Sequence, residues 1–96
     1  MDRELVLDKL KHYKETNGTK FQIKEIGIFG SVVRGENTSE SDLDVIISLE
    51  KPDMYVMVHI KEDIEKEVGC AVDLVRYRTH MNKYLKEQIE KEAVFV

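Results

Sequence analysis

The stretch from Ile26 to Ser48 constrains the fold more than any other part of the chain. It begins with an apolar run that ends in the pair Gly30-Ser31, and a second apolar run follows the triplet Asp42-Leu43-Asp44. The many β-branched residues, bounded by Gly, Asn and Ser, predict two strands joined by a tight turn, a short helix and a polar loop. If both strands serve one site, the end of the first lies beside the start of the second, so the two strands are antiparallel.

Asp42 and Asp44 are the first candidate site residues. Side chains alternate along a strand, so these two carboxylates point to one face, about 6.6 Å apart. Two carboxylates on one face repel each other unless a positive charge lies between them. Mg²⁺ takes oxygen ligands and is usually held by one or two carboxylates together with substrate phosphates. The pair therefore predicts a magnesium site, although each residue alone could be an ordinary solvent-facing aspartate.

Asp73 is the third candidate, because it lies inside the apolar run from Cys70 to Arg76. This run is predicted to be a third strand, and a helix from Asp53 to about Val68 connects it to the second. Strands joined through a helix are parallel, with a right-handed crossover, so their N-terminal ends share one edge of the sheet. Asp73 is then expected to face Asp42 and Asp44. An unpaired carboxylate in an apolar strand is otherwise costly to bury.

The pair Gly30-Ser31 is the candidate phosphate-binding turn. Glycine allows the backbone to turn sharply or to approach a ligand closely. Ser31 would then open a helix whose free N–H groups can cradle a phosphate. Taken singly, Gly30 is an ordinary turn residue and Ser31 an ordinary helix cap. The combination with Asp42, Asp44 and Asp73 is harder to explain by chance and favours a site for a metal ion and a phosphate.

Two cationic side chains, Arg34 and Lys83, are further candidates for contacts with a substrate phosphate. Arg34 either pairs with Glu36 or Asp42 as a structural tie, or meets a substrate phosphate bidentately. Lys83 belongs to a basic group that follows the third strand and could reach a triphosphate from the side. Spacing alone does not place such cations.

These motifs resemble the signature of the DNA polymerase beta-like nucleotidyltransferase superfamily. The residues that carry the resemblance are Gly30-Ser31-Val32-Val33-Arg34-Gly35, then Ser41-Asp42-Leu43-Asp44, with Asp73 at the position of the third aspartate. One departure is Val33, where the family usually has alanine. Within the superfamily the short chain resembles the minimal nucleotidyltransferases, called MNT proteins, many of which are the antitoxin halves of HEPN–MNT toxin–antitoxin pairs.

The resemblance implies transfer of a nucleoside monophosphate, typically AMP from ATP, to a hydroxyl group, with two Mg²⁺ ions and with pyrophosphate leaving. Asp42 and Asp44 would bind both ions, and Asp73 would bind the catalytic ion and help to remove the acceptor's proton. The implied acceptor is a tyrosine of a HEPN toxin, which would make the chain a protein adenylyltransferase. Two alternatives remain: an antitoxin that neutralises its partner by contact alone, and an enzyme that acts on a small molecule.

Length and composition limit the number of domains, the kinds of partner and the location of the protein. A chain of 96 residues forms one domain, residues 1–96, with one modest core. The formal net charge of −4 disfavours nucleic-acid binding through bulk charge. We expect a cytoplasmic protein, because Cys70 has no cysteine to pair with and no signal peptide or membrane-spanning run is present. The sequence leaves the oligomeric state open, and both a homo-oligomer and a hetero-oligomer are possible.

The predicted fold is α/β, with a three-stranded mixed sheet in α-β-α-β-α-β-α order. Helices are expected mainly on one face, and the other face is expected to stay open. A first helix should run from Asp2 to about Thr16, ended by Asn17-Gly18. Thr79 or Asn82 should cap a last helix that reaches about Glu92, and the apolar end after it should dock on the sheet or serve an interface. In the helix after Pro52, we expect Met54, Tyr55 and Val58 to include exposed side chains ready for a partner.

Overall fold

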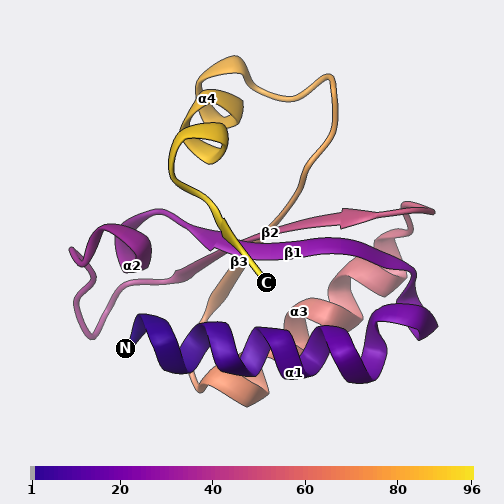
Figure 1. The fold of residues 1–96 in the computed structure, drawn as a ribbon, viewed down its shortest axis with the longest axis horizontal. Coiled ribbons are helices and arrows are strands. Elements are labelled where there is room, and N and C mark those ends of the chain that lie inside the picture. Colours follow the sequence, from indigo (N-terminus) through magenta and orange to yellow (C-terminus); the bar gives the residue numbers. More distant parts are fainter. Residues whose placement is uncertain (1) are drawn as a thin grey trace.

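The centre of the structure is a mixed sheet, shown in a computed structural model that describes residues 2–96 (Figure 1). Its strands are β1 (Ile23–Phe29), β2 (Leu43–Leu49), β3 (Val72–Arg76) and β4 (Val94–Phe95). They lie in the order β3-β2-β1-β4. β1 is antiparallel to β2, and β2 is parallel to β3. Both predicted strand directions are therefore confirmed.

The predicted number of strands is wrong, because β4 adds a fourth at the edge of the sheet. β4 pairs antiparallel with β1, with Gly27 opposite Phe95 and Ile28 opposite Val94. The close approach requires glycine, since a Cβ atom at Gly27 would collide with the Val94 carbonyl oxygen. The apolar C-terminal end thus docks on the sheet, one of the two outcomes that the sequence left open.

Helices cover both faces of the sheet (Figure 1). α1 (Arg3–Phe21) and α3 (Met54–Val68) pack on one face, where the sequence predicted them. α4 (Lys83–Glu92) lies on the other face, which is therefore not open as predicted. Ile89 of α4 packs there against Phe29 and Ile46. α4 is amphipathic, so its apolar stripe must be buried. The sheet face opposite α1 and α3 has the apolar surface that α4 can cover.

Strand alternation assigns the side chains to the two faces. Leu43, Val45 and Ile47 of β2 belong to the core under α1 and α3, whereas Ile46 belongs to the cluster under α4. Asp44 is two residues before Ile46, so its side chain is on the α4 face of the sheet. The candidate carboxylates are therefore on the face that only α4 covers.

The first helix is longer than predicted. α1 continues through Asn17-Gly18 and ends at Phe21, followed by Gln22 in the left-handed conformation at φ 55°. The Gln22 N–H caps the helix by donating to the carbonyls of Gly18 and Thr19. Phe21 packs against the main core, so tertiary packing overrides the local stop signal.

The other helix ends agree with the predictions. Asp53 is the N-cap of α3 and Gly69 ends it at φ 75°, while Asn82 is the N-cap of α4.

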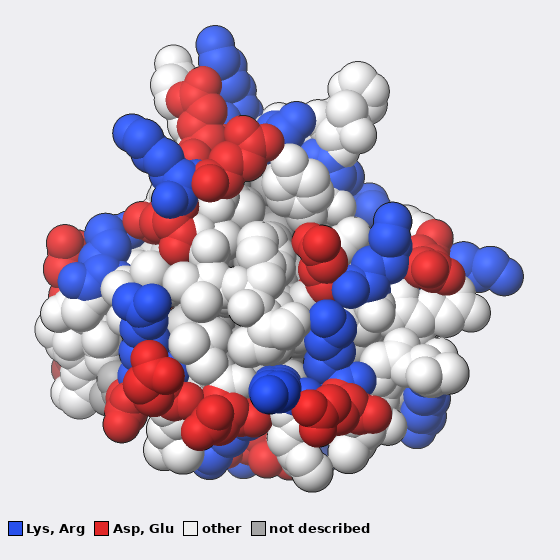
Figure 2. Space-filling model, viewed as in Figure 1, with Lys and Arg blue, Asp and Glu red and all other residues white. Residues whose placement is uncertain are grey.

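None of the helices within residues 2–96 is long and apolar enough to cross a membrane. In the view of Figure 2, charges of both signs surround an uncharged central area over β1 and β4.

Candidate functional site

The three predicted aspartates gather at one end of the sheet. Asp44 and Asp73 are paired positions of the parallel β2–β3 ladder, and Phe29, the last residue of β1, is opposite Asp44. Neighbouring strands lie about 4.8 Å apart, so the backbones of Asp44 and Asp73 are direct neighbours. Asp42 precedes β2 by one residue, and the Asp44 side chain is half-buried. The N-terminal ends of β2 and β3 thus meet the C-terminal end of β1.

Gly30 fits against this group because it lacks a side chain. It adopts φ 80° and ψ −151°, a backbone region that is essentially restricted to glycine. A Cβ atom at Gly30 would collide with the Asp44 carboxylate oxygen Oδ2. The turn after β1 therefore touches Asp44 directly.

Ser31 begins the short helix α2 (Ser31–Arg34) and is half-buried. The turn is closed by the Glu36 N–H, which donates to the Ser31 carbonyl at 2.9 Å, and by Gly35 in the left-handed conformation. Within residues 2–96, the Ser31 hydroxyl makes no hydrogen bond to another residue. That hydroxyl is available at the edge of the aspartate group.

Arg34 makes two carboxylate contacts. Its Nε donates to Glu36 at 3.0 Å, and its Nη1 donates to both carboxylate oxygens of Glu92, at 2.9 and 3.0 Å. Of the two structural partners that the sequence suggested, Glu36 is observed and Asp42 is not. The phosphate-binding role of Arg34 stays a prediction.

Glu92, at the end of α4, was missed by the sequence analysis. Its Oε1 accepts hydrogen bonds from the Gly30 N–H, from Arg34 and from Gln88 Nε2, each at 2.9 Å. Glu92 therefore ties α4 to the turn that holds Gly30. One sequence signal could have indicated a partner: a carboxylate in the last turn of a helix is disfavoured by the helix dipole.

The electrostatics of this group favour a cation. Burial raises the pKa of Asp44 above its ordinary value, and the charges of Asp73 and Asp42 raise it further, while Arg34 opposes the shift. For Glu92, partial burial raises the pKa, but hydrogen bonds from Gln88, Arg34 and Gly30 outweigh it and lower the pKa overall. The aspartates thus repel one another, whereas Glu92 is satisfied by its donors.

The aspartates fit a magnesium ion that also takes phosphate ligands. Within residues 2–96, no three His, Cys, Asp or Glu side chains form a ready-made metal cage. Mg²⁺ does not need such a cage, because it usually binds through one or two carboxylates, waters and substrate phosphates. Asp44 and Asp73 supply adjacent carboxylates whose mutual repulsion a cation would relieve.

Lys83 is at the end of α4 that is remote from Glu92. It is the first residue of α4, and Glu92, the residue that reaches Gly30, is the last. A helix rises 1.5 Å per residue, so the two ends of α4 are about 14 Å apart. The nucleotide-binding role predicted for Lys83 stays untested.

Comparisons with known proteins find similar sequences over most of the chain. The family model described as "Polymerase beta, Nucleotidyltransferase" matches residues 8–96. A relative from Methanocaldococcus jannaschii, provisionally named as a protein adenylyltransferase, is 33% identical over 90 residues, which are 91% of this chain and 90% of the relative. The protein adenylyltransferase MntA of Thermococcus cleftensis is 34% identical over 86 residues, covering 88% of this chain and 85% of its own.

Solved structures share the fold. One is a toxin–antitoxin complex with AMP-PNP, similar at a TM-score of 0.75 and 20% identity over 92% of this chain and 69% of that chain. Another holds a tri-AMPylated HEPN toxin of Shewanella oneidensis with its MNT antitoxin, at a TM-score of 0.71 and 18% identity over 97% of this chain and 70% of that chain.

Proposed function

Because the chain belongs to the polymerase beta nucleotidyltransferase family, we propose that it transfers AMP from ATP to a hydroxyl group of a partner protein. The observation that carries the proposal is the pairing of Asp44 with Asp73 beside the Gly30 turn. Phosphoryl transfer depends mostly on positioning and charge neutralisation, which a small constellation of carboxylates and a turn can supply. The predicted nucleotidyltransferase is confirmed at the level of the family.

Each site residue has a proposed role. Asp42, Asp44 and Asp73 would hold Mg²⁺, two ions in the full reaction, which would neutralise the phosphates and the leaving pyrophosphate. Gly30 and the Ser31 hydroxyl would position the β- and γ-phosphates. Asp73, on the strand at the open edge of the sheet, would accept the proton of the attacking hydroxyl.

Arg34 would support this arrangement chiefly through its contacts. Its guanidinium joins Glu36 and Glu92 and so fixes α2 against α4. The remaining N–H donors of the guanidinium could still meet a phosphate, because it has five and is exposed.

The proposed acceptor is a tyrosine of a HEPN-type toxin, so that the chain acts as the antitoxin. Support comes from the relative named protein adenylyltransferase MntA and from the fold shared with an MNT antitoxin bound to an AMPylated HEPN toxin. A cytoplasmic location would agree with the use of ATP. Two alternatives are neutralisation of the partner by contact alone and AMP transfer to a small molecule. Either would be favoured if no AMP were transferred to a protein.

The experiment compares two labels on ATP, with Mg²⁺ and a purified HEPN-type protein as acceptor. Label at the α-phosphate should move onto the acceptor, and label at the γ-phosphate should not, because pyrophosphate leaves. Asp44→Asn should abolish the transfer while the protein still unfolds cooperatively. Transfer of the γ-label would identify a kinase and refute the proposal.

A further inference from the structure

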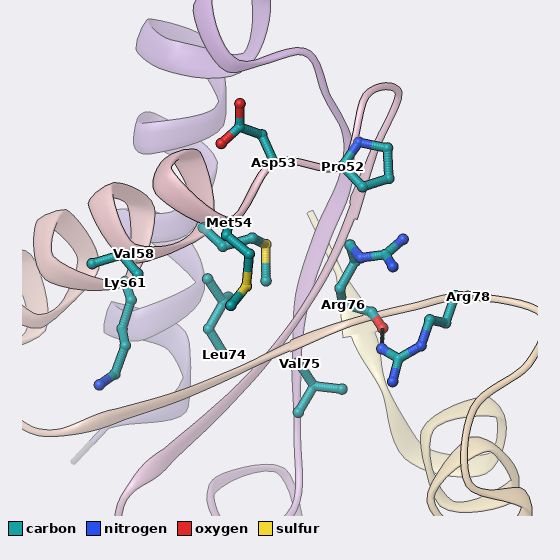
Figure 3. A pocket seen from close by; sticks show the side chains of 10 residues that line it. Pro52, Asp53, Met54, Val58, Lys61, Leu74, Val75, Arg76 and Arg78 are labelled. Carbon is teal, nitrogen blue, oxygen red and sulfur yellow. Dashed lines mark hydrogen bonds between the residues drawn. The ribbon is translucent and has the colours of Figure 1, made fainter.

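A groove of about 720 Å³ lies between α3 and β3, apart from the aspartate group (Figure 3). We call it the α3–β3 groove, and it is lined by Pro52, Asp53, Met54, Met57, Val58, Lys61, Leu74, Val75, Arg76 and Arg78. In Figure 3, Met54, Val58 and Leu74 lie on one side of it, and the guanidinium groups of Arg76 and Arg78 on the other. The groove therefore combines an apolar wall with a basic one.

The apolar side chains at the start of α3 are exposed beyond what packing requires. The exposed fractions are 80% for Met54, 89% for the adjacent Tyr55 and 52% for Val58. The same helix buries Ile60 and Ile64 completely, so its core contacts are made elsewhere. A contiguous exposed apolar patch beside a groove is typical of a protein–protein contact.

The charge in the groove opposes that of the whole chain. Its charged lining residues are Lys61, Arg76, Arg78 and the single acid Asp53, in a chain of net charge −4. Asp53 is occupied as the helix cap, since it accepts the N–H groups of Tyr55 and Val56. Within residues 2–96, none of the three basic side chains forms an ion pair with a carboxylate. They are available to acidic groups of another molecule.

The groove and the proposed catalytic site share the edge strand β3. Leu74, Val75 and Arg76 line the groove, and Asp73 precedes them on the same strand. Arg76 is three residues from Asp73, about 10 Å along the strand and on the opposite face, whereas Val75 is two residues from Asp73 and on the same face. β3 is also the outer strand of the sheet, so its outward backbone edge is not paired with another strand of residues 2–96. A protein held in the groove would therefore have to reach around the outer edge of β3, past Val75, to meet Asp73 on the other face.

We propose that the α3–β3 groove docks an acidic segment with apolar anchors, belonging to the protein whose hydroxyl accepts AMP. This inference rests on the proposed function and extends it, because it explains how so small a domain selects a protein acceptor. The apolar anchors would cover Met54, Tyr55 and Val58, and the acidic groups would pair with Lys61, Arg76 and Arg78. A partner docked there and extending around the outer edge of β3 would bring the acceptor hydroxyl to Asp73 on the other face.

In the test, short random peptides from a display library are selected for binding to the whole wild-type protein. The affinity of the selected peptides is then compared between two double variants. Val58→Glu with Lys61→Glu alters the groove. Leu5→Glu with Lys66→Glu is the matched control, since Leu5 is 53% exposed, close to the 52% of Val58, and Lys66 is an exposed residue of α3 outside the groove. Thermal melts show whether both variants remain folded.

The selected peptides should carry acidic and apolar residues. They should bind the groove variant at least about tenfold more weakly than the wild type, as expected for loss of a central contact, and bind the control unchanged. Added to the transfer reaction with a HEPN-type acceptor, they should reduce labelling of that acceptor. If the groove variant fails to fold, Arg76→Glu with Arg78→Glu repeats the test from the β3 wall.

Peptides that are basic, or that bind both variants equally, would overturn the proposal. So would anionic lipid vesicles or RNA that bind the wild type and lose binding in the groove variant, because the groove would then serve a membrane or a nucleic acid. Mg²⁺–ATP binding, measured by calorimetry, should be the same in all the variants. Its absence in the wild type would count against the proposed function and not against the docking surface.

Discussion

At the scale of single residues, Gly30 joins backbone geometry to the chemistry of the site. Its φ of 80° and ψ of −151° are essentially restricted to glycine, and a Cβ atom there would strike Asp44. Gly30→Ala is expected to lower the free energy of unfolding by about 1–3 kcal/mol. Because Asp44 would have to rotate away, Mg²⁺–ATP affinity should also fall. Urea unfolding and calorimetry measure the two effects.

Gly69→Ala is the control for backbone strain. Gly69 has a φ of 75°, and a Cβ atom at this position would have no neighbour within 4 Å. It ends α3, which packs on the face of the sheet opposite to the Asp44 side chain. Its replacement should cost about 1–2 kcal/mol and leave nucleotide affinity intact. Equal Mg²⁺–ATP affinities of the Gly30→Ala and Gly69→Ala proteins would contradict the placement of the turn in the site.

Glu92 should stabilise the fold in a pH-dependent way. Its folded pKa is lowered, despite partial burial, by hydrogen bonds from Gln88, Arg34 and Gly30. A lowered carboxyl pKa contributes stability above the unfolded value of about 4.3, and this contribution is lost as the pH falls through the folded pKa. Glu92→Gln should therefore lower the melting temperature at pH 7, with a smaller difference from wild type below pH 4.

Glu87→Gln is the matched control, because Glu87 is an exposed residue of the same helix. Its melting temperature should follow that of the wild type across the pH range. A constant difference in melting temperature between Glu92→Gln and wild type from pH 7 to pH 3 would contradict this account. It would mean that the charge of Glu92 does not strengthen its contacts with Arg34 and Gly30.

At the scale of elements, α1 and α3 are joined by one partly buried hydrogen bond. The Tyr13 hydroxyl donates to Asp63 Oδ2 at 2.7 Å, and Tyr13 is buried. Burial, and then the hydrogen bond and charge of Asp63, raise the pKa of Tyr13 far above its ordinary value. Tyr13→Phe should cost about 0.5–1.5 kcal/mol at pH 7.

The same bond predicts the alkaline behaviour of the protein. A raised tyrosine pKa contributes stability that is present below the unfolded value of about 10 and is lost as the pH rises above it. The wild type should therefore lose stability above pH 10 more steeply than Tyr13→Phe does. Parallel urea-unfolding curves of the two proteins across that range would contradict the account.

Elements with a strong periodic pattern could be predicted from the sequence, and long-range contacts could not. The helix between β2 and β3 fixed their parallel direction, so Asp73 could be placed beside Asp44. β4 has only two residues, too few for a strand pattern, and its docking depends on the distant Gly27. The hydrogen bond between Glu92 and Gly30 joins residues that are equally far apart in the sequence. The local sequence of α4 therefore does not indicate that Gly30 is the partner of Glu92.

At the scale of the whole molecule, the two faces of the sheet have different tasks. The face under α1 and α3 holds the main core, while the α4 face carries the carboxylates. β3 joins the site to the open edge of the sheet, because Asp73 and the lining of the α3–β3 groove share that strand. Such an arrangement suits an enzyme whose acceptor is a protein that approaches along the edge.

The most direct test of the central claim is one measurement series on Asp73→Asn: Mg²⁺–ATP affinity and the single-turnover rate of AMP transfer to a HEPN-type acceptor. Asp42 and Asp44 remain to hold the nucleotide's metal, so much of the affinity should persist. The transfer rate should fall by about 10²–10⁴-fold, the usual cost of losing a general base. A transfer rate equal to that of the wild type would contradict the assignment of Asp73 and with it the proposed site.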